Sequence, residues 1–462
     1  MKRFQVAYVP VGAPTFHLES AKKEFEHSIA LLQAACQEVM PAQEVESSKI
    51  EVELRVPQEM LLSIDLLQSF LESIQPDLIV LQNITFANAA FASEVLHRFR
   101  ETPILLWTLR EPAIDGGRLR LNSLTGAYSA ANTIKQFRRE PINYIFGAPE
   151  EEKVRAHVEA TVRAAHLRFL MQDLRMASIG HTPQGFGFGR ALDQDLLEKF
   201  GVRLESIEAR ELIQLAKSYT DEECEAYLID AKNRMTGWEK MPEKNVRDFA
   251  RLYKAYETYV KEHQIGALSS RCWPDFFTDF GTPVCAVLAM LNDLGVAASC
   301  EADAYGALSM YAGMKLSGSA VFFGDPVSMD EAENTITFWH CGTAACSLAR
   351  EDTGALVGEH CNRHIGPTCE FGCKPSGEAT IFRIGRNADG TYRFFLANGE
   401  ILDKPKQFLG TSLVVKTHAN AEKMVYETVE AGWEPHFVVI YKNVQKELEI
   451  LGKMLNVEIV KY

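Results

Sequence analysis

Four segments in the second half of the chain place carboxylates or imidazoles where strands or helices are expected to begin or end. Glu301 and Asp303 stand at the start of an apolar predicted helix, Asp325 follows the glycine that ends a buried strand, His340 ends another strand, and His436 precedes the last long strand. Each has an ordinary structural explanation alone, as a helix cap, a turn residue or a hydrogen-bonded histidine. Together, mixed carboxylate and imidazole groups suit Mn²⁺ or a similar divalent ion.

The ten cysteines suggest no comparable centre. Cys361, Cys369 and Cys373 lie close together in the sequence, but they lack the paired Cys-x₂-Cys spacing of zinc ribbons. A disulfide scaffold would be a short secreted chain, which this chain is not. We therefore expect reduced thiols with no assigned chemistry.

The glycine-rich segment 184–190 follows a predicted strand and resembles a dinucleotide-binding loop. Its Gly-x-Gly-x-Gly spacing differs from the Gly-x-Gly-x-x-Gly that cradles a pyrophosphate. We expect a loop that borders the active site, and no nucleotide cofactor.

Three stretches of different pattern must position these residues. Residues 1–172 and 173–334 alternate short apolar strands with helices, which indicates parallel sheets covered by helices. Residues 335–462 carry β-branched and aromatic runs separated by turn residues, followed by a terminal helix. The expected fold class is therefore α/β: two parallel-sheet α/β domains, the second carrying the acidic ligands, and then a β-rich, barrel-like C-terminal domain.

Composition limits the partners. With 48 Lys and Arg against 62 Asp and Glu, the formal net charge is −14, which argues against nucleic acid and anionic membranes as partners. No run approaches the roughly 18 apolar residues of a membrane span. The first residues suggest a strand and its loop instead of a signal peptide, so we expect a cytoplasmic protein.

The sequence resembles the L-fucose/L-arabinose isomerase superfamily, and in its length the compact bacterial branch. The resemblance is carried by residues 300–310 (CEADAYGALSM), by residues 321–334 (VFFGDPVSMDEAEN) with the following His340-Cys341-Gly342, and by residues 435–444 (PHFVVIYKNV). Glu301 and Asp325 are separated much as the acidic metal ligands are in the fucose isomerase branch. Weaker likeness extends to residues 116–123, 271–274 and 398–400.

This resemblance implies metal-dependent interconversion of an open-chain aldose and its ketose. Glu301, Asp325 and His436 would bind Mn²⁺, or another divalent cation such as Mg²⁺ or Co²⁺. Glu301 and Asp325 would also be the catalytic carboxylates of a cis-enediol route, in which one serves carbon and the other oxygen; a hydride shift is the alternative route. The family often has His-His where this sequence has Pro435-His436, so His436 alone represents that position.

Substrate contacts are expected from several loops. The resemblance and the residue types together suggest His340, Trp273, Arg271, Arg118, Asn122 and His17. The family forms homo-oligomers, hexamers among them, so a neighbouring subunit could supply the segment 116–123.

Two substrate classes stay open. A neutral sugar of the L-fucose or D-arabinose type needs hydroxyl partners, whereas sulfoquinovose, handled by some members of this branch and converted to sulfofructose, needs fixed donors for its sulfonate. The candidate donors are Arg110, Arg118, Arg120, Arg190, Arg271 and Arg363. A non-catalytic sugar-binding protein or regulator of the same architecture is the alternative function, but it has no need for the metal-ligand set.

Overall fold

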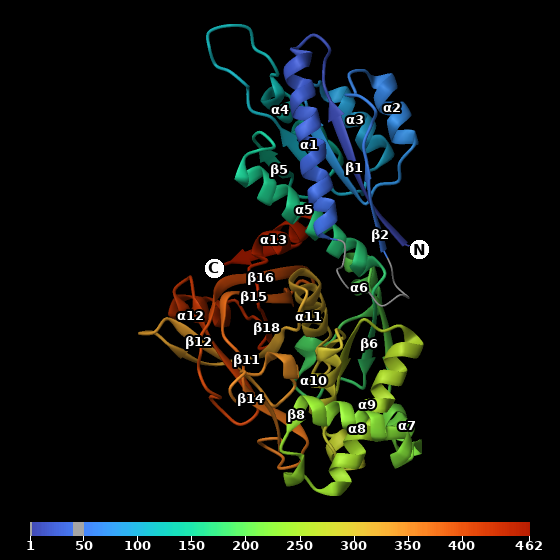
Figure 1. Ribbon diagram of the computed structural model, residues 1–462, viewed down its shortest axis with the longest axis vertical. Helices are drawn as coiled ribbons and strands as arrows, with labels where there is room; N and C mark the ends of the chain where they lie inside the picture. The colour runs from blue at the N-terminus through green and yellow to red at the C-terminus, as the bar shows by residue number, and fades with distance from the viewer. Residues whose placement is uncertain (1, 40–49) are drawn as a thin grey trace. The chain divides into compact units, whose positions relative to one another are not determined.

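The chain forms two compact units in a computed structural model that describes residues 2–39 and 50–462 (Figure 1). The first unit comprises Met1–Leu170 and Lys446–Val457, and the second comprises Met171–Gln445 and Glu458–Tyr462. Each unit is described by itself below.

A parallel sheet forms the centre of the first unit, with strand order β2-β1-β3-β4-β5. The sheet and its helices are β1 (Lys2–Val11), α1 (Leu18–Glu38), β2 (Ile50–Arg55), α2 (Ile64–Glu72), β3 (Leu78–Asn83), α3 (Ala89–Arg98), β4 (Ile104–Thr108), α4 (Ser123–Phe137), β5 (Asn143–Phe146), α5 (Glu152–Gln172) and α13 (Gln445–Met454). The strand order reverses between β1 and β3, where α/β sheets usually place ligands.

Both faces of this sheet are buried. Phe4, Val6 and Tyr8 of β1 pack with α1 and α5 on one face. Val9 and Val11 of the same strand pack with α2, α3 and α4 on the other. Buried strands of this kind appear as continuous apolar runs in a sequence, which is the pattern that predicted the parallel sheet.

The second unit begins with another parallel sheet, of order β10-β9-β6-β7. Its strands and the helices of this part are β6 (Arg175–Ile179), α6 (Asp193–Phe200), β7 (Arg203–Ile207), α7 (Ala209–Ser218), α8 (Asp221–Arg234), α9 (Glu243–His263), β9 (Ala267–Ser270), α10 (Cys285–Asp293), β10 (Ala297–Ser299) and α11 (Ala304–Ser317).

A closed barrel of six antiparallel strands follows in the order β16-β15-β18-β11-β12-β17, and β16 pairs with β17 to close it. Besides short helical turns, the other strands and helices of this unit are β8 (Met235–Thr236), β11 (Phe322–Asp330), β12 (Thr335–His340), β13 (Ala355–Gly358), β14 (Thr368–Gly372), β15 (Ser376–Arg386), β16 (Tyr392–Ile401), β17 (Thr411–Thr417), α12 (Ala421–Glu430), β18 (Phe437–Ile440) and β19 (Glu458–Lys461). The expected α/β class with parallel sheets and a barrel-like C-terminal part is confirmed.

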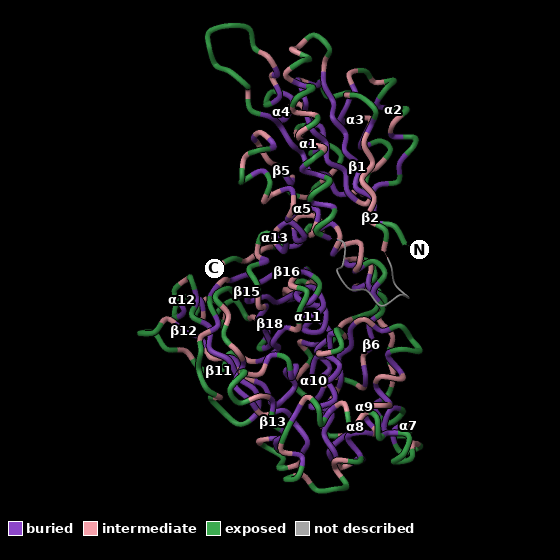
Figure 2. Tube along the Cα trace, viewed as in Figure 1, coloured by how far each residue is buried: buried purple, intermediate pink, exposed green. Residues whose placement is uncertain are grey.

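Helix α11 joins the sheet to the barrel. It packs against β9 and β10 and also against β15 and β18, and almost all of its residues are buried (Figure 2). A helix that is apolar on all sides is expected in such a position. At Gly313, a Cβ would lie 2.8 Å from Ile440 of the barrel, so glycine lets the helix approach the barrel closely. Within the described residues, no helix is long and apolar enough to cross a membrane.

Candidate active site

Two carboxylates meet at one nitrogen of a buried histidine. His436 is 1% exposed, and its Nε2 lies 3.0 Å from Glu301 Oε2 and 3.5 Å from Asp325 Oδ1. The structure thus brings together the three residues that the sequence proposed as metal ligands.

Barrel register explains two of these positions. Strands β11 and β18 are antiparallel, and Gly324 pairs with Phe437, so the next residues along, Asp325 and His436, face each other at the same end of the barrel. Strand β12 pairs with β11 on its other edge and ends at His340. Three neighbouring strands therefore deliver a carboxylate and two imidazoles to one place.

Glu301 reaches this place from a strained turn between β10 and α11. Glu301 and Ala302 both have positive φ, 57° and 54°, which costs about 1–2 kcal/mol for each non-glycine residue. Such strain is typical of functional sites, where the surrounding structure holds a side chain in a required direction. Here it directs the Glu301 carboxylate toward His436.

Asp303 is the site residue whose importance the sequence did not reveal. It is fully buried and forms a two-point ion pair with the equally buried Arg383, at 2.5 and 3.0 Å. Its Oδ2 also accepts a hydrogen bond from His436 Nδ1 at 2.9 Å, and its Oδ1 caps α11 by accepting from the Gly306 amide. Asp303 therefore fixes the imidazole so that Nε2 points at the two carboxylates.

His340 and Trp273 complete the wall around Glu301. His340 is 2% exposed, and it forms with Glu301 and His436 a group whose possible ligand atoms all lie within 4.8 Å. Trp273 Nε1 lies 3.5 Å from Glu301 Oε1. Both residues were predicted to contact the substrate, and both lie beside the expected ligands.

The glycine-rich segment 184–190 borders the site, as the sequence predicted. Phe188 packs edge-on against His436, with ring centroids 5.4 Å apart, and Phe186 packs against Trp273 at 5.9 Å. A Cβ on Gly189 would lie 2.8 Å from the Asp303 Cα. The close approach of this segment therefore requires glycine at position 189.

Electrostatics favour positive charge at the centre of this cluster. Burial alone would lower the pKa of His436, but its hydrogen bonds to Asp303 and Glu301 raise the pKa to about 10. Burial would raise the pKa of Glu301, yet His436 and His340 hold it below its usual value. Burial raises the pKa of Asp325. The acidic groups thus stabilise a cation where Nε2 meets the two carboxylates.

The possible ligand atoms around His436 Nε2 can be compared with the spacing of a divalent-metal site. Ligands at about 2.0–2.1 Å in an octahedral site lie about 2.9 Å from their neighbours, close to the 3.0 Å between His436 Nε2 and Glu301 Oε2. One imidazole with two carboxylates is a donor set that Mn²⁺ or Mg²⁺ accepts. The hydrogen bond from Nδ1 to Asp303 is the kind of outer contact that metal-bound histidines usually have.

Of the six arginines considered for a sulfonate, three lie in the second unit. Arg271 is held by an ion pair with Asp275 at 2.8 Å. Arg363 instead stacks on the Trp273 ring at 4.9 Å, and within the described part of the chain it has no carboxylate partner. Arg190, also without an ion pair there, lines a cavity of about 570 Å³ that Ala302 also lines but Glu301 does not.

The remaining predicted contacts lie in the first unit, where backbone contacts bring their loops together. His17 caps α1 by accepting from the Ser20 amide, and its own amide donates to the Arg120 carbonyl at 2.9 Å. Arg118 donates to the Thr15 carbonyl. Asn122, with φ of 53°, is the residue before α4.

These loops follow β1 and β4 at the carboxyl edge of the parallel sheet, beside the point where the strand order reverses. Open α/β sheets bind their ligands at this edge. A substrate role for His17, Arg118 and Asn122 stays a prediction.

Comparison with known proteins identifies relatives along the whole chain. Those found are named sulfoquinovose isomerase. That of Clostridium sp. (strain MSTE9) is 59% identical over 458 residues, with 99% of both chains covered. That of Priestia aryabhattai is 35% identical over 466 residues, with 99% of both covered, and that of Alkalicoccus urumqiensis is 35% identical over 407 residues, covering 87% of this chain and 90% of its own. No protein-family model matches the chain.

Proposed function

The chain belongs to the family of these sulfoquinovose isomerases, and on that basis we propose that it is a metal-dependent isomerase that converts the aldose sulfoquinovose into the ketose sulfofructose. One observation carries the proposal beyond the family names: Glu301 and Asp325, 24 residues apart in sequence, face the same nitrogen of His436. A sugar-binding protein without catalysis has no need of that arrangement.

A divalent ion held by Glu301, Asp325 and His436, with Mn²⁺ the first choice and Mg²⁺ or Co²⁺ as alternatives, would act as a Lewis acid toward the substrate oxygens. Asp303 keeps the proton of His436 on Nδ1, which leaves Nε2 free for that role. Arg383 keeps Asp303 ionised and in place.

The chemical step needs a group that moves a proton between two adjacent carbons. In the cis-enediol route, one carboxylate, Glu301 or Asp325, removes the proton from C2 of the open-chain sugar, and the C1 carbonyl becomes a hydroxyl. The same carboxylate then returns a proton to C1, while the C2 oxygen loses its proton and becomes the ketone. The second carboxylate assists the proton transfer between the oxygens.

The arginine beside Trp273 supports a sulfosugar as the substrate. Arg363 stacks on the face of Trp273, whose indole nitrogen approaches Glu301. Its guanidinium has no carboxylate to neutralise it among the described residues, and a guanidinium offers the fixed donors that a sulfonate needs. We assign Arg363 to the sulfonate in preference to Arg190, because the cavity that Arg190 lines includes none of the three metal ligands.

We also propose that the enzyme is a cytoplasmic homo-oligomer, with a hexamer as the form that the family resemblance suggests. In such an assembly the loops of His17, Arg118 and Asn122 are the expected contribution to substrate binding.

A panel of sugars tests the function and the substrate together. The protein is first freed of metal by a chelator. It is then incubated with sulfoquinovose, L-fucose or D-arabinose, with and without Mn²⁺, and the ketose formed is measured. We expect conversion of sulfoquinovose that requires the metal. Conversion of only the neutral sugars would reject the substrate assignment, and binding of sulfoquinovose without conversion would favour a non-catalytic binding protein.

A further inference from the structure

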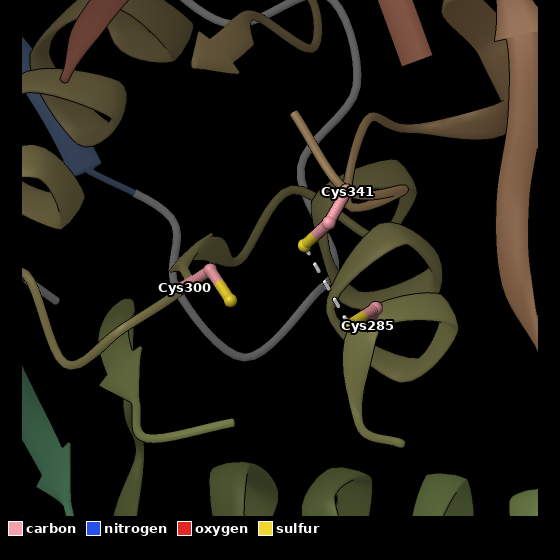
Figure 3. A group of neighbouring side chains, drawn as sticks. All are labelled: Cys285, Cys300 and Cys341. Atoms are coloured by element: carbon pink, nitrogen blue, oxygen red, sulfur yellow. Dashed lines mark hydrogen bonds between the residues drawn. The ribbon is translucent and has the colours of Figure 1, made fainter. Parts of the chain in front are cut away.

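Three buried thiols from different elements converge next to the candidate active site (Figure 3). Cys285 is the first residue of α10, Cys300 follows β10, and Cys341 follows β12. They are 0%, 0% and 6% exposed, and their sulfur atoms all lie within 4.8 Å of one another. Figure 3 shows the three sulfurs pointing into a common space.

We propose that Cys285, Cys300 and Cys341 form a second metal site, which binds a thiolate-preferring ion such as Zn²⁺ while the oxygen-preferring ion occupies the centre at His436. Zinc–sulfur bonds of about 2.3 Å in a tetrahedral site put neighbouring sulfurs about 3.8 Å apart. The sulfurs of Cys285 and Cys341 are 3.9 Å apart. This pair therefore has nearly the spacing that zinc requires, and the third sulfur lies within 4.8 Å of both.

The surroundings suit metal-bound thiolates. Cys285 begins α10, and the positive end of a helix dipole favours a thiolate at that position. His340 Nδ1 lies 3.3 Å from the Cys341 sulfur, where it can donate a hydrogen bond to a ligating sulfur. Cys272, 1% exposed, interacts with the Cys300 thiol and is a candidate for a fourth position.

The two proposed metal sites use different kinds of ligand, but their residues are neighbours in the sequence. Cys300 directly precedes Glu301, and Cys341 directly follows His340. An ion bound by the three thiols would therefore tie together the strained turn that presents Glu301 and the end of the strand that presents His340. Soft sulfur ligands and hard oxygen ligands select different ions, so both sites can be filled at once.

Cadmium, a soft probe for zinc-type thiolate sites, tests the proposal. The reduced, full-length protein is freed of metal and titrated with Cd²⁺, and the ultraviolet thiolate-to-cadmium charge-transfer band is recorded. Because the buried site can be slow to open, a second preparation is refolded in the presence of Cd²⁺ and measured in the same way. Cys285→Ala is compared with Cys36→Ala, which removes a thiol of similar burial from the first unit. Circular dichroism verifies that both variants fold.

We expect a band that saturates at one Cd²⁺ per chain, is lost in Cys285→Ala, and persists in Cys36→Ala. The band should also persist in Glu301→Gln, so that failure of the active-site assignment and failure of this one give different results. On unaltered chain, bound Cd²⁺ should protect Cys285, Cys300 and Cys341 from alkylation, as read by mass spectrometry. Absence of the band in both preparations, or an unprotected cluster, would overturn the proposal.

Discussion

Asp303 Oδ2 accepts a hydrogen bond of 2.9 Å from His436 Nδ1, while both Asp303 oxygens pair with Arg383 in a fully buried ion pair. This relationship makes the direction of His436 Nε2 depend on a residue that does not itself face the proposed metal. Outer contacts of this kind typically contribute 10–100-fold to metal affinity.

Asp303→Asn should therefore weaken Mn²⁺ binding about 10–100-fold and lower the free energy of unfolding by about 3–5 kcal/mol, because it leaves the Arg383 charge buried and unpaired. Titration calorimetry and urea unfolding measure the two effects. As a control, Glu370→Gln removes a more exposed ion pair with Lys406 and should cost at most about 1 kcal/mol. Unchanged Mn²⁺ affinity in Asp303→Asn would contradict the positioning role.

Two glycines of one loop give a matched pair. Gly189→Ala places a methyl group 2.8 Å from the Asp303 backbone, whereas Gly187→Ala meets nothing within 4 Å. Gly189→Ala should displace Phe188 from His436 and reduce kcat/KM about tenfold or more, since this corresponds to only about 1.4 kcal/mol of lost transition-state stabilisation. Gly187→Ala should behave like the unaltered chain in the same assay. Equal activity of the two variants would show that the contact is unimportant.

The sulfonate assignment predicts a change in selectivity. Arg363→Gln should raise KM for sulfoquinovose about 10–100-fold, the effect of losing a hydrogen bond to a charged group worth about 1.5–3 kcal/mol. Binding of a neutral aldose such as L-fucose should hardly change, and Arg190→Gln should be nearly silent with both sugars. Steady-state kinetics of both variants and of the unaltered chain, with each of the two sugars, measure these changes in KM. A larger effect of Arg190→Gln would move the sulfonate to the other arginine.

The proton-transfer route makes an isotope prediction. A carboxylate that carries the proton from C2 to C1 exchanges it with solvent, so the reaction in D₂O should place deuterium at C1 of the ketose. Proton NMR of the isolated product detects it. A product without deuterium would exclude the cis-enediol route as proposed and favour a hydride shift at the same centre.

Much of the fold was predictable because buried strands and helices have a recognisable pattern of apolar residues in the sequence. Short, mostly apolar runs such as 77–81 and 103–109 are typical of strands buried in a parallel sheet, and Asn387-Ala388-Asp389-Gly390 is typical of the turn that joins β15 to β16. Closure of the barrel was harder to predict from the sequence, because it depends on the pairing of β16 with β17. The register of these two strands is set by tertiary packing. The terminal helix was expected, but its ion pair with Arg163 of the first unit, through Glu447, leaves no local signal.

The candidate site could be proposed where residue types coincide with the ends of strands and helices. That pattern selected Glu301, Asp303, Asp325, His340 and His436 as a group, and the family resemblance proposed three of them as metal ligands. Asp303 had a sufficient local explanation as a helix cap, which it also is, so its partners 80 and 133 residues away went unrecognised. One signal was available: Arg383 stands within the apolar run of β15, and a charge there requires a buried partner.

The thiol cluster had no such signal. The three cysteines come from separate elements and lack any paired motif in the sequence. Only the packing of α10 against β10 and against the turn after β12 brings Cys285, Cys300 and Cys341 together. The structure holds all ten cysteines as free thiols.

The most direct test of the account is the Mn²⁺-dependent rate of sulfoquinovose isomerisation by Glu301→Gln, compared with Glu333→Gln, an exposed control. Glu301→Gln keeps the shape of the side chain but removes its charge, so a loss of about 10²-fold or more is expected in a protein that remains folded, while Glu333→Gln keeps full activity. Retained isomerisation by folded Glu301→Gln would contradict the claim that catalysis occurs where Glu301 and Asp325 meet His436.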